Sequence, residues 1–119
     1  MNQESQSKVL RLLVGLLSAT QRGQLTWQQT DSPNRFAAVL GSGSVVVSAN
    51  ELWVQDSDGN TIEHNNAILQ DFVGELPGAD DQTRSVSFGQ LMGLVNEAAR
   101  RQALNVDQTL DALLADLGS

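Results

Sequence analysis

The last third of the chain predicts two consecutive helices, each with an apolar side that needs a packing partner. Ser87 and Gln90 have the Ser-x-x-Gln spacing of a capping box, in which each side chain can satisfy a free backbone N–H at a helix start. Apolar residues then recur at three- and four-residue spacing, as they do on one side of a helix: Phe88, Leu91, Met92, Val95, Ala98 and Ala99. Asn105 can end this helix, so any fold for this chain must supply apolar surface beside it.

The stretch from Val106 to Leu117 repeats the same spacing. Its apolar residues are Leu110, Leu113, Leu114 and Leu117, and Gly118 provides a stop signal. Burial of a leucine stabilises a fold by roughly 1.5–3 kcal/mol. We therefore expect this helix to belong to the core, and its deletion to unfold the chain.

A further helix is predicted near the N-terminus, from Ser7 to Gln21. One stripe contains Val9, Leu12, Leu13, Leu16 and Leu17, and Leu10 and Val14 widen it. A stripe this wide indicates burial against more than one surface. Gly23 ends the helix.

The middle of the chain predicts about five short strands. Leu25–Thr30 is rich in residues that favour strands, and a turn at Asp31–Asn34 follows it. Two hairpins come next, one around Gly41–Gly43 and one around Asp56–Asn60, where Asp-Gly marks the tip. Short links of this kind favour an antiparallel meander, with strands at 36–40, 44–48, 52–55 and 61–64.

Residues 65–76 fit a short helix, with Asn65 or Asn66 as its cap and with Ile68, Leu69, Phe72, Val73 and Leu76 as its apolar residues. Residues 77–84 are polar and predict a loop. The predicted fold is a single α+β domain over residues 1–119. It has an N-terminal helix, an antiparallel meander of about five strands, and C-terminal helices packed on one face.

Charge and composition exclude several classes of function. The net charge is −7, and residues 36–119 carry twelve acidic side chains against three arginines. An acidic body repels phosphate backbones, so we expect no nucleic-acid partner. No stretch approaches the ~20 apolar residues of a membrane span, so we expect no membrane partner. The chain has no cysteine, which fits a cytoplasmic protein.

Three motifs suggest chemistry, and each has a simpler interpretation. Asp56-x-Asp58-Gly59 resembles the start of a calcium loop, but an EF-hand needs its glycine at the sixth position and flanking helices. His64 is the only histidine, and strand alternation places the neighbouring Glu63 on the opposite face. The two C-terminal helices could form a helix-turn-helix, but the second is acidic and has no Lys or Arg. We therefore predict no catalytic, cofactor-binding or metal-binding residues, no cofactor, and no enzymatic activity.

Two stretches, residues 23–47 (GQLTWQQTDSPNRFAAVLGSGSVVV) and 94–117 (LVNEAARRQALNVDQTLDALLADL), carry a loose resemblance. Together they resemble small uncharacterised bacterial α+β proteins of unknown function, which have a strand meander and a helical tail. The resemblance covers about half the chain and carries no catalytic residue onto it. The size, acidity and leading helix are also similar to those of dimeric α/β secretion chaperones. Those chaperones return to strands after a central helix, whereas this chain ends in helices.

These observations favour a non-enzymatic cytoplasmic interaction or regulatory protein that self-associates. We expect a homodimer and leave a separate protein partner open. The predicted interface residues are Leu10, Val14, Leu17, Trp53, Leu113 and Leu117. Tryptophan at position 53 has two interpretations, as core packing or as an interface anchor. The first alternative function is a small-molecule binding domain with a pocket between the sheet and the helices, and a deep apolar pocket would favour it. The second alternative is an enzyme of unknown type.

Overall fold

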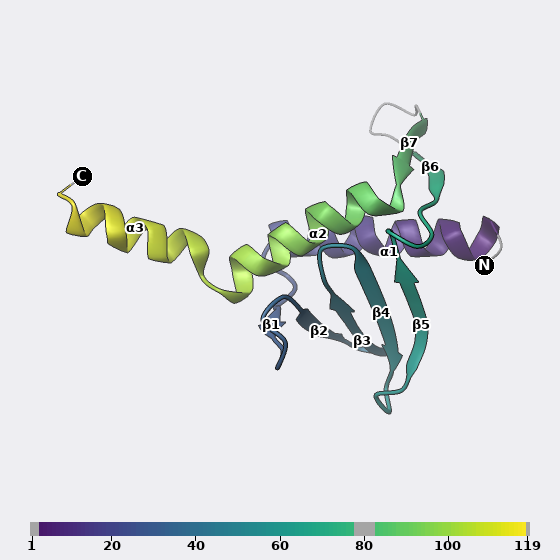
Figure 1. The fold of residues 1–119 in the computed structure, drawn as a ribbon, viewed down its shortest axis with the longest axis horizontal. Coiled ribbons are helices and arrows are strands. Elements are labelled where there is room, and N and C mark those ends of the chain that lie inside the picture. The colour runs from purple at the N-terminus through teal and green to yellow at the C-terminus, as the bar shows by residue number, and fades with distance from the viewer. Residues whose placement is uncertain (1–2, 78–82, 119) are drawn as a thin grey trace.

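The computed structural model describes residues 3–77 and 83–118. Its elements, in chain order, are α1 (Gln3–Gln21), β1 (Gln28–Gln29), β2 (Phe36–Leu40), β3 (Gly43–Val47), β4 (Glu51–Asp56), β5 (Thr61–Asn66), β6 (Val73–Pro77), β7 (Thr83–Ser87), α2 (Phe88–Ala103) and α3 (Val106–Asp116). An N-terminal helix, a five-stranded antiparallel sheet and two C-terminal helices make up an α+β fold, which confirms the predicted class (Figure 1).

The main sheet is the predicted meander, with strand order β1-β2-β3-β4-β5. All neighbouring strands are antiparallel, and Val46 of β3 lies between Ala37 of β2 and Trp53 of β4. Both predicted hairpins are present. The first strand is shorter than predicted, because only Gln28 and Gln29 pair with β2.

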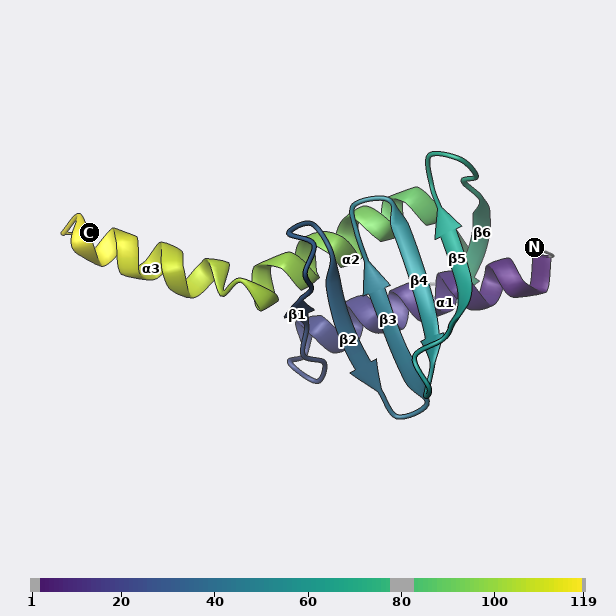
Figure 2. The same cartoon turned by 60° about the horizontal axis from the view of Figure 1, so that its bottom comes forward.

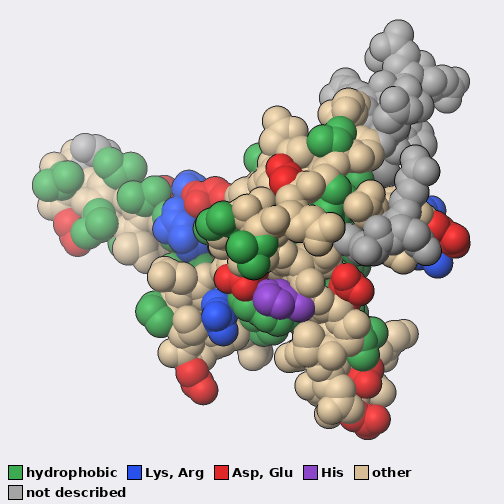
Figure 3. Space-filling model, turned by 45° about the vertical axis from the view of Figure 1, so that its right-hand side comes forward, with side chains coloured by type: hydrophobic (Ala, Val, Ile, Leu, Met, Phe, Trp, Pro, Cys, Tyr) green, Lys and Arg blue, Asp and Glu red, His purple; other side chains and the backbone are tan. Residues whose placement is uncertain are grey.

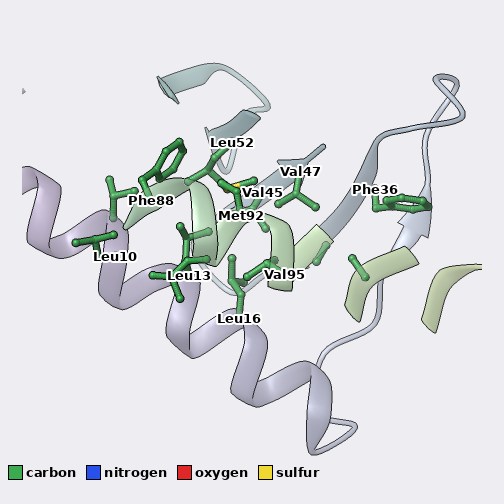
Figure 4. Packing of buried hydrophobic residues seen from close by; sticks show 14 of the residues in the cluster. Leu10, Leu13, Leu16, Phe36, Val45, Val47, Leu52, Phe88, Met92 and Val95 are labelled. Carbon is green, nitrogen blue, oxygen red and sulfur yellow. The ribbon is translucent and has the colours of Figure 1, made fainter. Parts of the chain in front are cut away.

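Helices α1 and α2 both pack against one face of the main sheet (Figures 1 and 2). Alternation along the strands places the buried residues of the sheet on that face: Phe36, Ala38, Val45, Val47 and Leu52. Figure 4 shows Leu10, Leu13 and Leu16 of α1 beside Phe88, Met92 and Val95 of α2, with Val45 and Val47 of β3 on the other side of α2. The wide apolar stripe of α1 is explained because this helix contacts both the sheet side of the core and α2.

Gln102 of α2 holds the segment that connects α1 to the sheet. Its side-chain Nε2 donates a hydrogen bond to the Leu25 carbonyl, and its Oε1 accepts one from the Trp27 backbone N–H, both at 2.6 Å. The buried indole Nε1 of Trp27 donates to Thr20 Oγ1 at 2.8 Å. One glutamine therefore replaces the strand pairing that residues 25–27 lack, which is why the strand is short.

The helix boundaries follow the predicted signals. Ser87 Oγ accepts a hydrogen bond from the Gln90 backbone N–H at 3.1 Å, so Ser87 caps α2 as predicted. Gly23, after α1, and Gly118, after α3, have positive φ angles of 71° and 79°, which glycine adopts without steric cost. Helix α1 begins at Gln3, four residues before the predicted start.

The predicted short helix over residues 65–76 is wrong. The chain leaves β5, makes a turn at Asn66–Gln70, and enters β6 at Val73, which pairs with β7. Asp71 Oδ1 accepts hydrogen bonds from the N–H groups of Phe72 and Gly89, both at 2.9 Å. The Phe72 carbonyl also accepts from the Phe88 N–H, and the two rings stack with centroids 4.9 Å apart. These contacts with the start of α2 hold the segment extended.

The predicted loop over residues 77–84 is only partly tested, because residues 78–82 lie outside the described residues. On either side of them, β6 extends to Pro77 and β7 begins at Thr83. Within the part of the chain that the structure describes, no helix is long and apolar enough to cross a membrane.

Candidate functional site

Helix α3 is the element whose apolar side has no packing partner. Its leucines, which we call the α3 stripe, are Leu110, Leu113, Leu114 and Leu117 (the last at the C-cap), with 46%, 53%, 50% and 80% of their surfaces exposed. No residue of α3 is buried. The expectation that these leucines belong to the core is therefore wrong. In Figure 3, hydrophobic side chains gather on the arm that α3 forms at the left of the molecule.

The position of α3 is set by two residues at its start. Asn105 adopts a left-handed conformation (φ 51°, ψ 45°), which breaks the helical path between α2 and α3. Asn tolerates this conformation better than most residues do. Asp107 then pairs with Arg101 of α2, with a distance of 2.5 Å between Oδ1 and Nη2. The break and the ion pair direct α3 beyond the end of the sheet, where it cannot reach the core (Figures 1 and 2).

The polar side of α3 is acidic. The helix contains Asp107, Asp111 and Asp116 and no Lys or Arg. Of these acids, only Asp107 takes part in the ion pairs found among residues 3–77 and 83–118. A partner for the α3 stripe would therefore have to supply apolar surface bordered by positive charge.

The six predicted interface residues are divided among four environments, and the sixth residue, Trp53, is described in the next paragraph. Leu10 is 0% exposed and packs in the core, so its prediction as an interface residue does not fit the structure. The wide apolar stripe of α1 led to this prediction, but α2 and the sheet both cover the stripe. Val14 is 39% exposed on α1, and Leu17 is half-buried against the core. Leu113 and Leu117 lie on the α3 stripe, outside the core.

Trp53 lies on the sheet face opposite the helices, so it is neither a core residue nor a free anchor. Its ring stacks on the His64 ring, with centroids 5.0 Å apart and an interplanar angle of 7°. The Arg35 guanidinium carbon lies 4.5 Å from the Trp53 ring centroid. His64 Nε2 is 2.8 Å from Glu51 Oε2. These neighbours cover the indole, which leaves it half-buried.

A pocket of about 520 Å³ lies where α2 meets the sheet, in the region where the alternative function expected one, but none of its lining residues was singled out from the sequence. Two turns of the sheet, residues 32–36 and 48–51, form one side, and Asn96, Arg100 and Leu104 of α2 form the other. Asn96 Oδ1 is buried there without a hydrogen-bond partner.

Arg35 and Arg100 also line the pocket, but Glu97 binds Arg100 through two hydrogen bonds. The hydrogen bonds from Arg100 lower the pKa of the Glu97 carboxyl. Of the two arginines, Arg35 is therefore the one that carries no ion pair with a described residue.

The hairpin that resembles a calcium loop is held by its own polar groups. Asp56 Oδ1 accepts hydrogen bonds from the backbone N–H groups of Asp58 and Asn60, both at 3.0 Å, and Gly59 has a φ of 85°. This is the predicted hairpin turn. Among the described residues, no group of three or more His, Cys, Asp or Glu side chains could hold a metal ion.

Comparisons with known proteins do not add to this picture. No family model, no curated protein and no solved structure matches the chain.

Proposed function

We propose that this protein is a non-enzymatic cytoplasmic interaction or regulatory protein that forms a homodimer through the α3 stripe. One observation carries the proposal. Four leucines lie on one side of α3, and not one residue of that helix is buried. Large exposed apolar patches on a folded protein mark interaction sites.

The size of the stripe favours a second copy of the chain over a smaller partner. The exposed fractions of the four leucines correspond to somewhat more than two fully exposed side chains. Their burial would yield about 3–7 kcal/mol, at roughly 1.5–3 kcal/mol for each fully exposed leucine. Association costs an estimated 4–15 kcal/mol in lost freedom. A two-fold dimer buries two stripes but incurs this association cost only once. Burial of the exposed leucines therefore favours self-association over the binding of a smaller partner.

Sedimentation equilibrium at micromolar concentration tests the proposal. We expect the wild-type chain to be a dimer and the variant Leu113→Glu/Leu117→Glu to be a monomer. The matched control is Ile68→Glu/Leu69→Glu, because those residues are 77% and 83% exposed on the turn after β5, away from α3. A monomeric wild-type chain, or a leucine variant that dimerises as the wild type does, would contradict the proposal.

The pocket beside Asn96 favours a second candidate function, the binding of a small molecule. A buried amide oxygen without a partner loses its hydrogen bonds with water and gains none in return. A ligand with an N–H or O–H donor would satisfy Asn96 Oδ1, and an anionic group on it would pair with Arg35, which has no acidic partner in the part of the chain that the structure describes. The ligand class is therefore a small organic acid with a donor group, such as an amino acid or a hydroxy acid.

Thermal unfolding in millimolar amino acids and hydroxy acids tests this second function. We expect one of these compounds to raise the melting temperature of the wild-type chain, and Asn96→Leu to abolish the rise. Asn60→Leu, which lies on the distant β4–β5 hairpin, is the control. If no compound stabilises the wild-type chain, the pocket does not serve this ligand class.

A further inference from the structure

The side of α1 that faces away from the core is basic, in contrast to α3. Lys8 and Arg11 lie on one side of the helix, opposite the buried Leu13 and Leu16. Arg22 directly follows the last residue of α1, and its backbone N–H donates to the Ser18 carbonyl, which continues the helical spacing and places Arg22 on the same side. Lys8 pairs with Glu4 at 3.6 Å. None of the ion pairs within residues 3–77 and 83–118 involves Arg11 or Arg22. Two exposed arginines, one on α1 and one directly after it, are therefore available to acidic groups of another chain.

The surface between these arginines contains a glycine and borders apolar side chains. Gly15 lies between them on the same side of α1, and a Cβ atom added there would meet nothing within 4 Å. Val14, 39% exposed, lies beside it, and Leu94 on α2 is 54% exposed. Since α1 and α2 pack against each other, these residues offer apolar surface to a second helix. We call the exposed side of α1, from Arg11 to Arg22, the α1 face.

The α1 face and the α3 stripe complement each other in both charge and apolarity. Helix α3 combines exposed leucines with Asp111 and Asp116, which have no ion-pair partner among the described residues. Pairing α3 with a second α3 would instead bring together two helices that each carry three aspartates and no Lys or Arg. Like charges at close range oppose such a pair. The α1 face avoids that repulsion and supplies the opposite charge.

The acceptor of α3 must belong to another molecule, because α3 points away from its own α1 face. The molecule measures 54 × 39 × 28 Å, and α3 extends beyond the sheet along the longest direction (Figure 2). We propose that α3 of one copy docks on the α1 face of a second copy, and that the second α3 docks reciprocally on the first. This inference rests on the proposed homodimer and names its two complementary surfaces. Such an arrangement uses each surface once and closes as a two-fold dimer.

Charge exchange between two variants tests the pairing. The first variant is Arg11→Glu/Arg22→Glu, and the second is Asp111→Lys/Asp116→Lys. We expect each variant alone to weaken the dimer at least about tenfold, since each places like charges in both contacts. An equimolar mixture should form a heterodimer in native mass spectrometry, because one of its contacts is wild type and the other has both charges reversed. Asp31→Lys/Asp58→Lys, which changes two exposed aspartates on turns of the main sheet, is the charge-matched control and should leave the dimer unchanged.

Two outcomes would overturn the inference in different ways. If Arg11→Glu/Arg22→Glu dimerises as the wild type does while Leu113→Glu/Leu117→Glu is monomeric, α3 mediates self-association but the α1 face does not receive it. If the leucine variant also dimerises normally, the proposed function fails together with the inference. Circular dichroism of each variant checks the fold, which should persist because every substituted side chain is exposed.

Discussion

Removal of α3, by ending the chain after Asn105, should leave the rest of the molecule folded. We call that remainder, which contains α1, the strands and α2, the body. The structure identifies the contacts that the body loses when α3 is removed. No residue of α3 is buried, so no core contact disappears. The ion pair between Arg101 and Asp107 is lost, and an exposed pair of this kind contributes at most about 1 kcal/mol.

The alternative predicts a far larger effect. If the four leucines of the α3 stripe were fully buried in the core, their loss would cost about 6–12 kcal/mol, at roughly 1.5–3 kcal/mol each. A domain of this size has a total stability of only about 5–15 kcal/mol. The truncated chain would then be unfolded. The two accounts therefore differ by several kcal/mol in the free energy of unfolding, which equilibrium denaturation resolves.

Urea unfolding followed by tryptophan fluorescence measures this difference, because the buried indole of Trp27 reports on the core. The protein must be diluted below the concentration at which it dimerises, since association adds to the apparent stability. Leu13→Ala is the positive control. Leu13 is fully buried, and its truncation should cost about 2–5 kcal/mol. A truncated chain that is unfolded, or as destabilised as Leu13→Ala, would refute the assignment of α3 to the exterior.

Three further predictions concern the body. Gln102→Ala should lower the free energy of unfolding by about 1–3 kcal/mol in urea titration, because two backbone groups between α1 and β1 lose their partners; no change would mean that water replaces the amide. Gly59→Ala should cost about 1–2 kcal/mol in the same assay, because its φ of 85° is unfavourable for residues with a Cβ atom; Gly41→Ala is the control. Millimolar calcium should not raise the melting temperature, since Asp56 Oδ1 already accepts two backbone hydrogen bonds; a rise that Asp58→Ala abolishes would contradict the hairpin assignment.

The parts of the fold that the sequence predicted correctly are those governed by neighbouring residues. The Ser-x-x-Gln cap at Ser87, the Asp-Gly hairpin at Gly59 and the helix end at Asn105 all act within a few residues. The buried side of α2 was also predictable, because the sheet and α1 cover the side that its 3.6-residue period marks. In each case local propensity and tertiary packing favour the same conformation.

The mispredicted segment, residues 65–76, depends on contacts with residues distant in sequence. Its apolar spacing suits a helix, yet Ile68 and Leu69 are exposed and Phe72 is buried. Phe72 stacks on Phe88, and Asp71 accepts a hydrogen bond from the Gly89 N–H. Periodicity cannot reveal a partner sixteen residues away. The residues of the pocket beside Asn96 could not be predicted for the same reason, since two turns and a helix meet there only in the folded chain.

The predicted interface residues show what a periodic apolar stripe can and cannot indicate about a helix. Leu10 and Leu117 both belong to such stripes, but one is fully buried and the other is 80% exposed. The stripe indicates that a helix needs a partner, and it does not indicate whether that partner belongs to the same chain. Geometry decides between the two, because the break at Asn105 turns α3 away from the core while α1 stays against it. The sign of the charges then narrows the choice of partner. An acidic helix with an open apolar side favours a basic acceptor, and the exposed side of α1 offers Arg11 and the neighbouring Arg22 beside the partly exposed Val14.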